Sequence, residues 1–357
     1  MQGEAEFQER VVRAERPRRH FVFLISPDGS MLGLDADGAP ARYDDADDRV
    51  VWDRAADGLR HVATGRTVAA DIEGDTCTLT VGGEEVTFRI GHGPEKLPSA
   101  YLEHLRREGW VCLTCLLPPD IVEGLQRVAG TDRYEHLEMN NDSPKVCQHS
   151  AVGKAISEPI SLWLIRQYVG TRDLHLGHPP GLTALPPYDG ERRVQGWHAD
   201  IPYIPSVGGN PVADRGGPIK AVQRNVCVSD FRKDNGATAY KLGSHRAPTN
   251  PPPAWNPGRH GGDPAARPYS GPDSDVLEAP AGSIVLYDAR TWHRAGFNRS
   301  RRKRGAMLMS FQTADVIPKR DTRPTCKRLH ESPVYGELDA RQRRELTELL
   351  MNQPDTA

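Results

Sequence analysis

The stretch AGSIVLYDARTWHRAGFNRSRRKR, residues 281–304, decides the fold class of this 357-residue chain. Its run SIVLYD is rich in strand-forming residues and leads up to His293, after which a turn follows. A second short stretch, Gly-Trp-His-Ala-Asp at residues 196–200, places His198 and Asp200 two positions apart. Because residues i and i+2 of a strand point to the same side, these two side chains can hold one ion together.

The side chains of these two segments point to iron(II). Two imidazoles and one carboxylate on one face of an octahedron leave three positions open for a co-substrate and O2. We therefore expect His198, Asp200 and His293 to be the metal ligands and the catalytic centre. The competing interpretation is a chance HxD on an ordinary strand, since thirteen histidines offer many other candidates.

A cation lies at a fixed distance beyond His293. Arg304 follows it by 304 − 293 = 11 residues and opens the strand-like segment RGAMLMSFQT. A planar guanidinium can hold a carboxylate through two parallel hydrogen bonds, so we expect Arg304 to bind the distal carboxylate of 2-oxoglutarate. The basic run 299–304 is also conceivable as a nucleic-acid patch, but a solvated turn that enters a strand is the ordinary interpretation.

Further candidates would line the cavity around this centre. On the strand-like segment QRNVCVSD, Gln223 and Asn225 share one face, and a cavity that holds a charged co-substrate needs polar lining. We expect both to contact the co-substrate. Tyr203 and Trp197 flank the HxD and could shape the substrate pocket, although core packing is at least an equal interpretation for Trp197.

Four ordered segments together resemble the phytanoyl-CoA dioxygenase-like (PhyH) oxygenases, from about Pro98 to about Ala314. LEHLRREGWVCLTCLLPPDIVEGL is similar to the opening helix, GyvvL strand and second helix of that family, and HAD to its HxD. DFRKDNGATAYKLGSHR is similar to its "D…NG…PGSHR" segment, with Leu242 where the family usually has Pro. PAGSIVLYDARTWHRAGFNRSRRKR is similar to its "aGs…fd…H…gpNxSxxxR" segment, with Asn298 and Ser300 in matching places.

This resemblance implies a mainly β fold: a double-stranded β-helix (jelly-roll, cupin-like) with flanking helices and the metal inside. It implies iron(II) on His198, Asp200 and His293, and 2-oxoglutarate bound by Arg304 and Ser300. The implied activity is an Fe(II)/2-oxoglutarate-dependent oxygenase of secondary metabolism. It would use O2 to hydroxylate or otherwise oxidise an unactivated C–H of a small molecule, releasing succinate and CO2. The alternatives are a cupin-like metalloprotein that does not use 2-oxoglutarate and a non-catalytic binding module.

Composition changes along the chain predict three parts. Residues 1–95 read as a small all-β module of unknown role, because short apolar runs alternate with Asp-Gly and Gly-Gly turns. The Gly- and Pro-rich stretch 91–99 marks the boundary, and residues 96–330 form the oxygenase domain. Residues 331–357 are expected to contain a C-terminal helix that docks on the body or on a second subunit through Leu346, Leu349 and Leu350.

Charge and hydropathy limit the classes of partner that we expect for this protein. A formal net charge of −2 gives no reason to expect nucleic acid, so we expect a small-molecule substrate. The polar first twenty residues lack a signal-peptide core, and no stretch approaches the ~20 apolar residues of a membrane span. We therefore expect no membrane partner and a cytoplasmic protein. The oligomeric state is left open.

Several other residues have ordinary interpretations. Cys112 and Cys115 form a CxxC, but no second CxxC completes a zinc site, so packing of reduced thiols is expected. His245 is expected to bond a neighbouring loop, with a substrate contact as the alternative. His175 and His178 are expected in a loop or cavity lining. The Pro- and Gly-rich connection 247–275 is longer than most loops and is expected to be a lid or binding loop.

Overall fold

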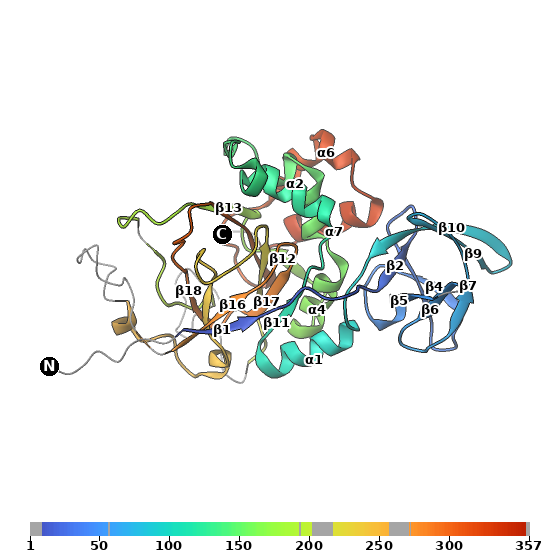
Figure 1. The fold of residues 1–357 in the computed structure, drawn as a ribbon, viewed down its shortest axis with the longest axis horizontal. Coiled ribbons are helices and arrows are strands. Elements are labelled where there is room, and N and C mark those ends of the chain that lie inside the picture. Colours follow the sequence, from blue (N-terminus) through green and yellow to red (C-terminus); the bar gives the residue numbers. More distant parts are fainter. Residues whose placement is uncertain are drawn as a thin grey trace.

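Three β-sheets and a group of helices make up the described part of the chain, as the computed structural model shows (Figure 1). The structure describes residues 9–55, 58–192, 194–201, 217–256, 271 and 273–354. The prediction of a mainly β chain with flanking helices is confirmed. Within the described ranges, no helix combines the length and the apolar character needed to cross a membrane.

One sheet of nine strands is built from residues 22–92, and all its neighbouring strands run antiparallel. A buried Trp52 anchors its core and donates from Nε1 to the Leu32 carbonyl at 2.9 Å. The strands are β2 (Val22–Ile25), β3 (Met31–Leu34), β4 (Pro40–Tyr43), β5 (Trp52–Ala55), β6 (Gly58–His61), β7 (Thr67–Ala69), β8 (Asp71–Glu73), β9 (Thr76–Val81) and β10 (Glu84–His92), with the 3-10 helix η1 (Asp48–Val50).

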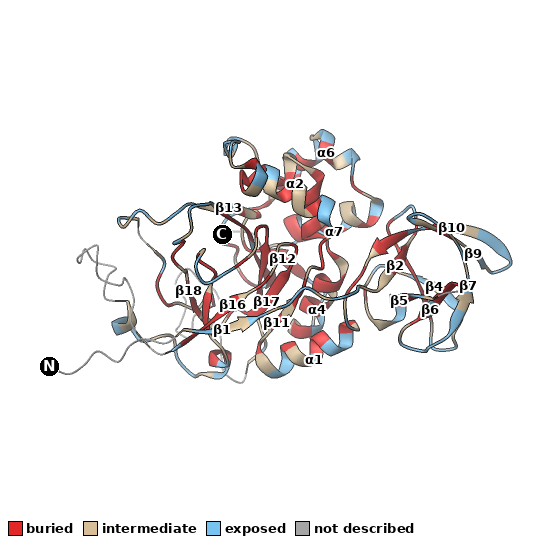
Figure 2. Cartoon of the chain, viewed as in Figure 1, coloured by how far each residue is buried: buried red, intermediate tan, exposed pale blue. Residues whose placement is uncertain are grey.

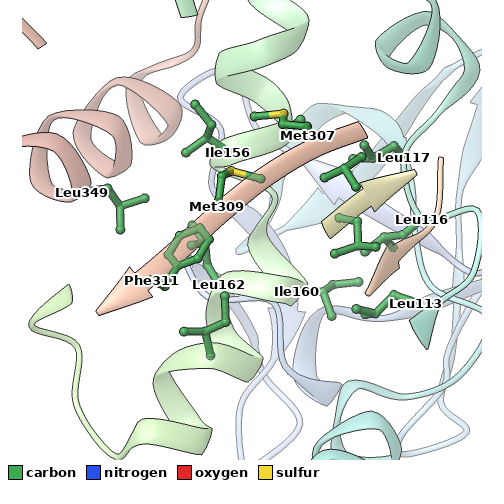
Figure 3. Packing of buried hydrophobic residues seen from close by; sticks show 14 of the residues in the cluster. Leu113, Leu116, Leu117, Ile156, Ile160, Leu162, Met307, Met309, Phe311 and Leu349 are labelled. Atoms are coloured by element: carbon green, nitrogen blue, oxygen red, sulfur yellow. The ribbon is translucent and has the colours of Figure 1, made fainter. Parts of the chain in front are cut away.

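A six-stranded sheet carries the main hydrophobic core on one of its faces. Its strands are β11 (Trp110–Leu113), β12 (Leu174–Leu176), β13 (Gly181–Leu185), β14 (Ala221–Cys227), β17 (Ile284–Asp288) and β19 (Arg304–Thr313). The covering helices are α1 (Pro98–Glu108), α2 (Pro119–Ala129), α3 (Ser150–Ile156) and α4 (Pro159–Val169). Alternate residues of β19 pack against helix side chains on this face (Figure 3). The other face carries the polar Gln223 and Asn225 together with apolar residues of a second cluster, among them Val285 and Tyr287.

A four-stranded sheet has the order β1-β16-β15-β18. Its strands are β1 (Glu9–Arg13), β15 (Ala239–Lys241), β16 (Ser274–Glu278) and β18 (Trp292–Arg294). Strand β1 was expected to belong to the module of residues 1–95, but it pairs with β16 in parallel, far from the nine-stranded sheet (Figure 1). The chain therefore starts its described course on this sheet, builds the nine-stranded sheet, and returns through α1.

The C-terminal region folds back onto the body. Helix α7 (Ala340–Met351) begins with a capping box between Asp339 and Gln342, in which each side chain bonds the other's backbone N–H. Leu346, Leu349 and Leu350 are buried in the main core, so of the two expected docking surfaces this helix uses the chain's own body. The remaining elements are α5 (Arg323–His330), α6 (Pro333–Gly336), η2 (Asp132–Tyr134), η3 (Lys145–Cys147), η4 (Ser244–Arg246) and η5 (Pro253–Trp255).

Candidate metal centre

Two short backbone segments bring the three expected metal ligands together. His198 and His293 exchange both backbone hydrogen bonds, each N–H donating to the other's carbonyl at 3.0 Å. The Asp200 N–H donates to the Ala289 carbonyl at 2.9 Å, two residues out of register with the His198–His293 bridge. Residues 195–201 therefore run beside the segment of β18, and the three side chains converge there.

The ligand atoms lie close enough to share one ion. His198 Nε2 is 3.7 Å from Asp200 Oδ1, and His293 Nε2 is 3.4 Å from Asp200 Oδ2. One such atom from each of the three residues lies within 4.8 Å of the other two. The exposed fraction of the side chain rises from 8% at His293 to 19% at His198 and 33% at Asp200. The centre is therefore reached from the Asp200 side.

The second ring nitrogen fixes the tautomer of both imidazoles. His198 Nδ1 is 2.8 Å from the Gly196 carbonyl, and His293 Nδ1 is 2.9 Å from the Thr291 carbonyl. A carbonyl can only accept, so each Nδ1 carries the proton and each Nε2 keeps its lone pair for a metal. The Gln195 amide nitrogen lies 2.9 Å from His198 Nε2, and this hydrogen bond would break when a metal binds.

Two tyrosines flank His293, and neither was singled out from the sequence. The rings of Tyr240 and Tyr287 lie 6.2 Å and 5.2 Å from the His293 ring. Tyr240 is the direct cross-strand partner of His293, and its hydroxyl accepts from Asn225 Nδ2 at 3.3 Å. Burial raises the pKa of both hydroxyls well above the usual range, so the wall beside His293 stays uncharged.

Arg304 is a buried cation whose donors are not all used. One Nη2 donates to the Gly236 carbonyl at 2.9 Å, and the guanidinium lies over the Phe231 ring at 4.4 Å. Its Nε is buried without a hydrogen-bond partner, and no described carboxylate forms an ion pair with it. Burial lowers the pKa of Arg304 to about 10. A buried guanidinium of this kind suits an anionic ligand group.

The turn before Arg304 explains why Asn298 and Ser300 recur in the motif. Asn298 is fully buried and donates from Nδ2 to the carbonyls of Leu185 and Arg302, both at 2.8 Å. Ser300 Oγ donates to Asn298 Oδ1 at 2.6 Å and to the Arg302 carbonyl at 3.1 Å. These bonds set the direction in which the chain enters β19. A contact of Ser300 with the co-substrate stays a prediction.

The inner face of the six-stranded sheet is polar where it faces the metal residues. Gln223 and Asn225 lie on it, because the intervening Arg224 points to the helices, and Gln223 Nε2 donates to Ser310 Oγ at 3.0 Å. Their contact with a co-substrate stays a prediction. Leu308, on the same face of β19 as Ser310, is 37% exposed within a fully paired strand. Open space therefore lies in front of this face.

The residues around the HxD have separate roles. The Trp197 side chain is 2% exposed and packs with Phe297 on the opposite side of the backbone from His198, which favours packing over pocket lining. Asn256 holds the Trp197 backbone at both ends, accepting from its N–H at 2.7 Å and donating to its carbonyl at 2.9 Å. Tyr203 lies outside the described residues, as do 257–270 and 272 of the expected lid.

The other candidate residues have structural surroundings. His245 packs on Gly109, whose φ of +74° suits glycine, and Ser244 accepts from the Trp292 N–H at 2.8 Å. His175 is fully buried on β12, and His178 bonds the Pro179 carbonyl. Cys112 and Cys115 are free, half-buried thiols, and in the described ranges neither belongs to a group able to hold a metal.

The residues present fit an iron(II) ion and an anionic co-substrate. Two imidazoles that carry their proton on Nδ1 and one carboxylate make a ligand set typical of non-haem iron(II). The buried, incompletely bonded Arg304 supplies a binding group for a carboxylate. His198, Asp200 and His293 could thus hold the metal, and Arg304 the co-substrate.

Comparison with known proteins agrees with this site. Residues 164–306 match the family model of phytanoyl-CoA dioxygenase (PhyH). Dioxygenase olcK of Penicillium canescens is 22% identical over 255 residues, which are 63% of this chain and 77% of that protein.

Two solved structures are also similar to this chain. The epimerase SnoN, in complex with Fe3+, alpha ketoglutarate and nogalamycin RO, is 17% identical, with 61% of this chain and 84% of SnoN covered and a TM-score of 0.43. The non-heme alpha ketoglutarate dependent carbocyclase SnoK from nogalamycin biosynthesis is 17% identical, with 65% of this chain and 93% of SnoK covered and a TM-score of 0.42.

The matched stretch contains every residue of the candidate centre. His198, Asp200, His293 and Arg304 all fall between residues 164 and 306, in the order that the motifs predicted. The resemblance that the sequence motifs indicated is therefore confirmed over residues 164–306, where this chain matches the phytanoyl-CoA dioxygenase family.

Proposed function

We propose that this protein is an Fe(II)/2-oxoglutarate-dependent oxygenase that hydroxylates or otherwise oxidises a C–H bond of a small molecule. The two sheets around the site would form the double-stranded β-helix of this class. The observation that carries the proposal is the convergence of His198, Asp200 and His293, with the proton of each imidazole held on Nδ1. The match to a dioxygenase family over these residues supports it.

Each side chain of the site has its own role in the proposed reaction. When bound, iron(II) and 2-oxoglutarate supply the activation of O2, coupled to decarboxylation of 2-oxoglutarate to succinate and CO2. His198, Asp200 and His293 hold the metal. The fixed tautomers of the two imidazoles keep protons off their Nε2 atoms. Arg304 holds the distal carboxylate, which gives its buried Nε a partner.

The inner face of the six-stranded sheet would orient both reactants. Gln223 and Asn225 offer amide groups close to Ser310 and Tyr240, so they suit the polar co-substrate. Leu308 lies four residues beyond Arg304 on the same face, a distance of roughly 13 Å along the strand. A five-carbon diacid spans only roughly 6 Å with C–C bonds of about 1.5 Å, so the exposed Leu308 is left for an apolar part of the substrate.

Anaerobic titration tests this function. Apo-protein receives Fe(II) and then 2-oxoglutarate, and the visible metal-to-ligand band of the chelate is followed. The band is expected in the wild type and absent in Asp200→Ala. Arg304→Met is expected to raise the 2-oxoglutarate dissociation constant by about 100-fold, the size expected for a buried charged hydrogen-bond partner, with Fe(II) affinity unchanged. Arg301→Met is the matched control, because Arg301 is exposed in the same turn.

The same experiment separates the alternatives. A cupin-like metalloprotein would bind Fe(II) without the 2-oxoglutarate-dependent band or succinate release, and a non-catalytic module would show neither. A wild type that forms no band would contradict the proposed function.

A further inference from the structure

Strand β1 lies on the outer edge of the sheet that carries the metal ligands. Residues Glu9–Arg13 pair in parallel with Ser274–Glu278, and the pairing continues with the Ala14 N–H donating to the Glu278 carbonyl at 2.8 Å. In Figure 1, β1 lies beside β16 on the barrel, whereas β2 to β10 form a separate body. Residues 9–13 are thus part of the metal-bearing sheet.

An ion pair between the buried Arg294 and the half-buried Glu9 connects β1 to β18. Arg294 is fully buried and donates from Nη2 to Glu9 Oε1 at 2.5 Å and to Ser274 Oγ at 3.3 Å. Lys233 Nζ lies 3.4 Å from the other Glu9 carboxylate oxygen. Glu9 is therefore one of the groups that hold the buried guanidinium of Arg294 in place.

Arg294 lies directly behind both metal-binding histidines. It follows His293 in the chain, and its guanidinium carbon is 5.4 Å from the ring of Trp197, the residue before His198. Neighbouring residues of a strand point to opposite faces, so Arg294 and Trp197 meet on the back of the backbone that presents the two imidazoles. Contacts on this back face fix the spacing of the two histidine segments.

We propose that Glu9 is a positioning residue of the metal site, acting through Arg294 and Trp197 on the segments that carry His293 and His198. The inference rests on the proposed function, because it assumes that these histidines bind a metal. It makes β1 a part of the catalytic barrel and separates it from the β-module that follows it in the chain.

The strand offers a matched control. Arg13 lies on the same face of β1 as Glu9 and pairs with Glu278 at 3.1 Å, but its side chain is 70% exposed. Arg13→Gln therefore removes an ion pair that joins β1 to β16 without touching Arg294. Glu9→Gln removes the carboxylate charge beside Arg294 and keeps the shape of the side chain.

The test is a titration of the full chain with Co(II), a spectroscopic substitute for iron(II), followed by ligand-field absorption. Glu9→Gln is expected to raise the Co(II) dissociation constant roughly three- to tenfold, less than the 10–100-fold typical of direct partners of a ligand, and to change the band shape. Arg13→Gln is expected to stay within about twofold of wild type, as distant surface changes do. Because Glu9 acts through Arg294, Glu9→Gln should add no further effect in an Arg294→Met background.

The outcomes are distinguishable. If Glu9→Gln and Arg13→Gln bind Co(II) alike, with the wild-type band shape, Glu9 is not a positioning residue and the proposed function still stands. If the wild type shows no Co(II) bands that Asp200→Ala removes, both the metal site and this inference are wrong. Circular dichroism melting of each variant confirms that the titrated protein is folded.

Discussion

The two faces of the six-stranded sheet differ in the side chains that they present, although the same strands form both faces. On one face Met307, Met309 and Phe311 of β19 are buried against helix side chains (Figure 3). On the other face the same strand presents Ser310 and the exposed Leu308. Buried residues nevertheless dominate the strands from both sides (Figure 2). The first face stabilises the fold, and the second is left partly open for ligands.

Two buried arginines, one on each face of the sheet, differ in their hydrogen-bond partners. Arg224 points to the helices and donates to Ser161 Oγ at 2.6 Å and to the Ala155 and Ile156 carbonyls, both at 2.8 Å. These carbonyls end helix α3, where no intrahelical donor reaches them. Arg304 points inward and has only one carbonyl partner, and the Nε of both arginines is buried without a partner. The cation with several protein acceptors supports the fold, and the one with a single acceptor keeps donors for a ligand.

The largest effect is expected from Arg224→Met. It leaves Ser161 and the end of α3 without their donor in the interior, so the free energy of unfolding should fall by roughly 3 to 4 kcal/mol. Arg304→Met should change it by less than about 1 kcal/mol, because only one carbonyl loses a partner. Urea unfolding followed by circular dichroism measures both. Equal losses for the two variants would remove the distinction between the faces.

A smaller difference in the free energy of unfolding is expected between substitutions at two neighbouring apolar residues of β19. Met309→Ala empties a packed site and should lower the free energy of unfolding by about 2 to 3 kcal/mol. Leu308→Ala should cost under about 1 kcal/mol, because a side chain that is 37% exposed leaves no closed cavity. The same unfolding assay applies. A loss at Leu308 as large as that at Met309 would mean that the inner face is packed and holds no substrate space.

The smallest effect concerns pH and the Glu9–Arg294 pair. Burial acts to raise the pKa of Glu9, but Arg294 and Lys233 outweigh it, so the pKa lies below its ordinary value of 4.5. A lowered carboxyl pKa adds stability above the unfolded-state value, and this is lost as pH falls through the folded-state value. At pH 7 the free energy of unfolding of the wild type should exceed that of Glu9→Gln by about 1 kcal/mol or less, and the difference should shrink as pH falls below 4.5 and through the lowered folded-state pKa. A difference that stays constant as the pH falls below 4.5 would contradict this linkage.

Much of the centre could be predicted because its signals are local. His198 and Asp200 share a strand face by simple alternation, and the eleven-residue interval from His293 to Arg304 spans one turn and one strand entry. The helix of Leu346, Leu349 and Leu350 showed its apolar face in the same way. Each of these patterns lies within a short window, where periodicity determines which side chains face inward.

The supports of the centre could not be predicted, because they depend on contacts between distant segments. Glu9 and Arg294 are 285 residues apart, and no local pattern marks either as a partner of the other. Asn256 holds the HxD backbone from a Pro-rich loop whose conformation periodicity does not describe. Tyr240 could have been found, since the motif "NG…GSHR" lies opposite His293 once the strand register is known.

The parallel pairing of β1 with β16 affects how the chain folds during its synthesis. Arg10 and its partner Asp275 are separated by 265 residues, so at 5–20 residues per second β1 waits on the order of tens of seconds for the strand it joins. Until then β1 has no strand to pair with, and an unpaired strand edge invites association with other chains. The four-stranded sheet therefore depends on a strand made at the start of synthesis that stays unpaired until most of the chain has been made.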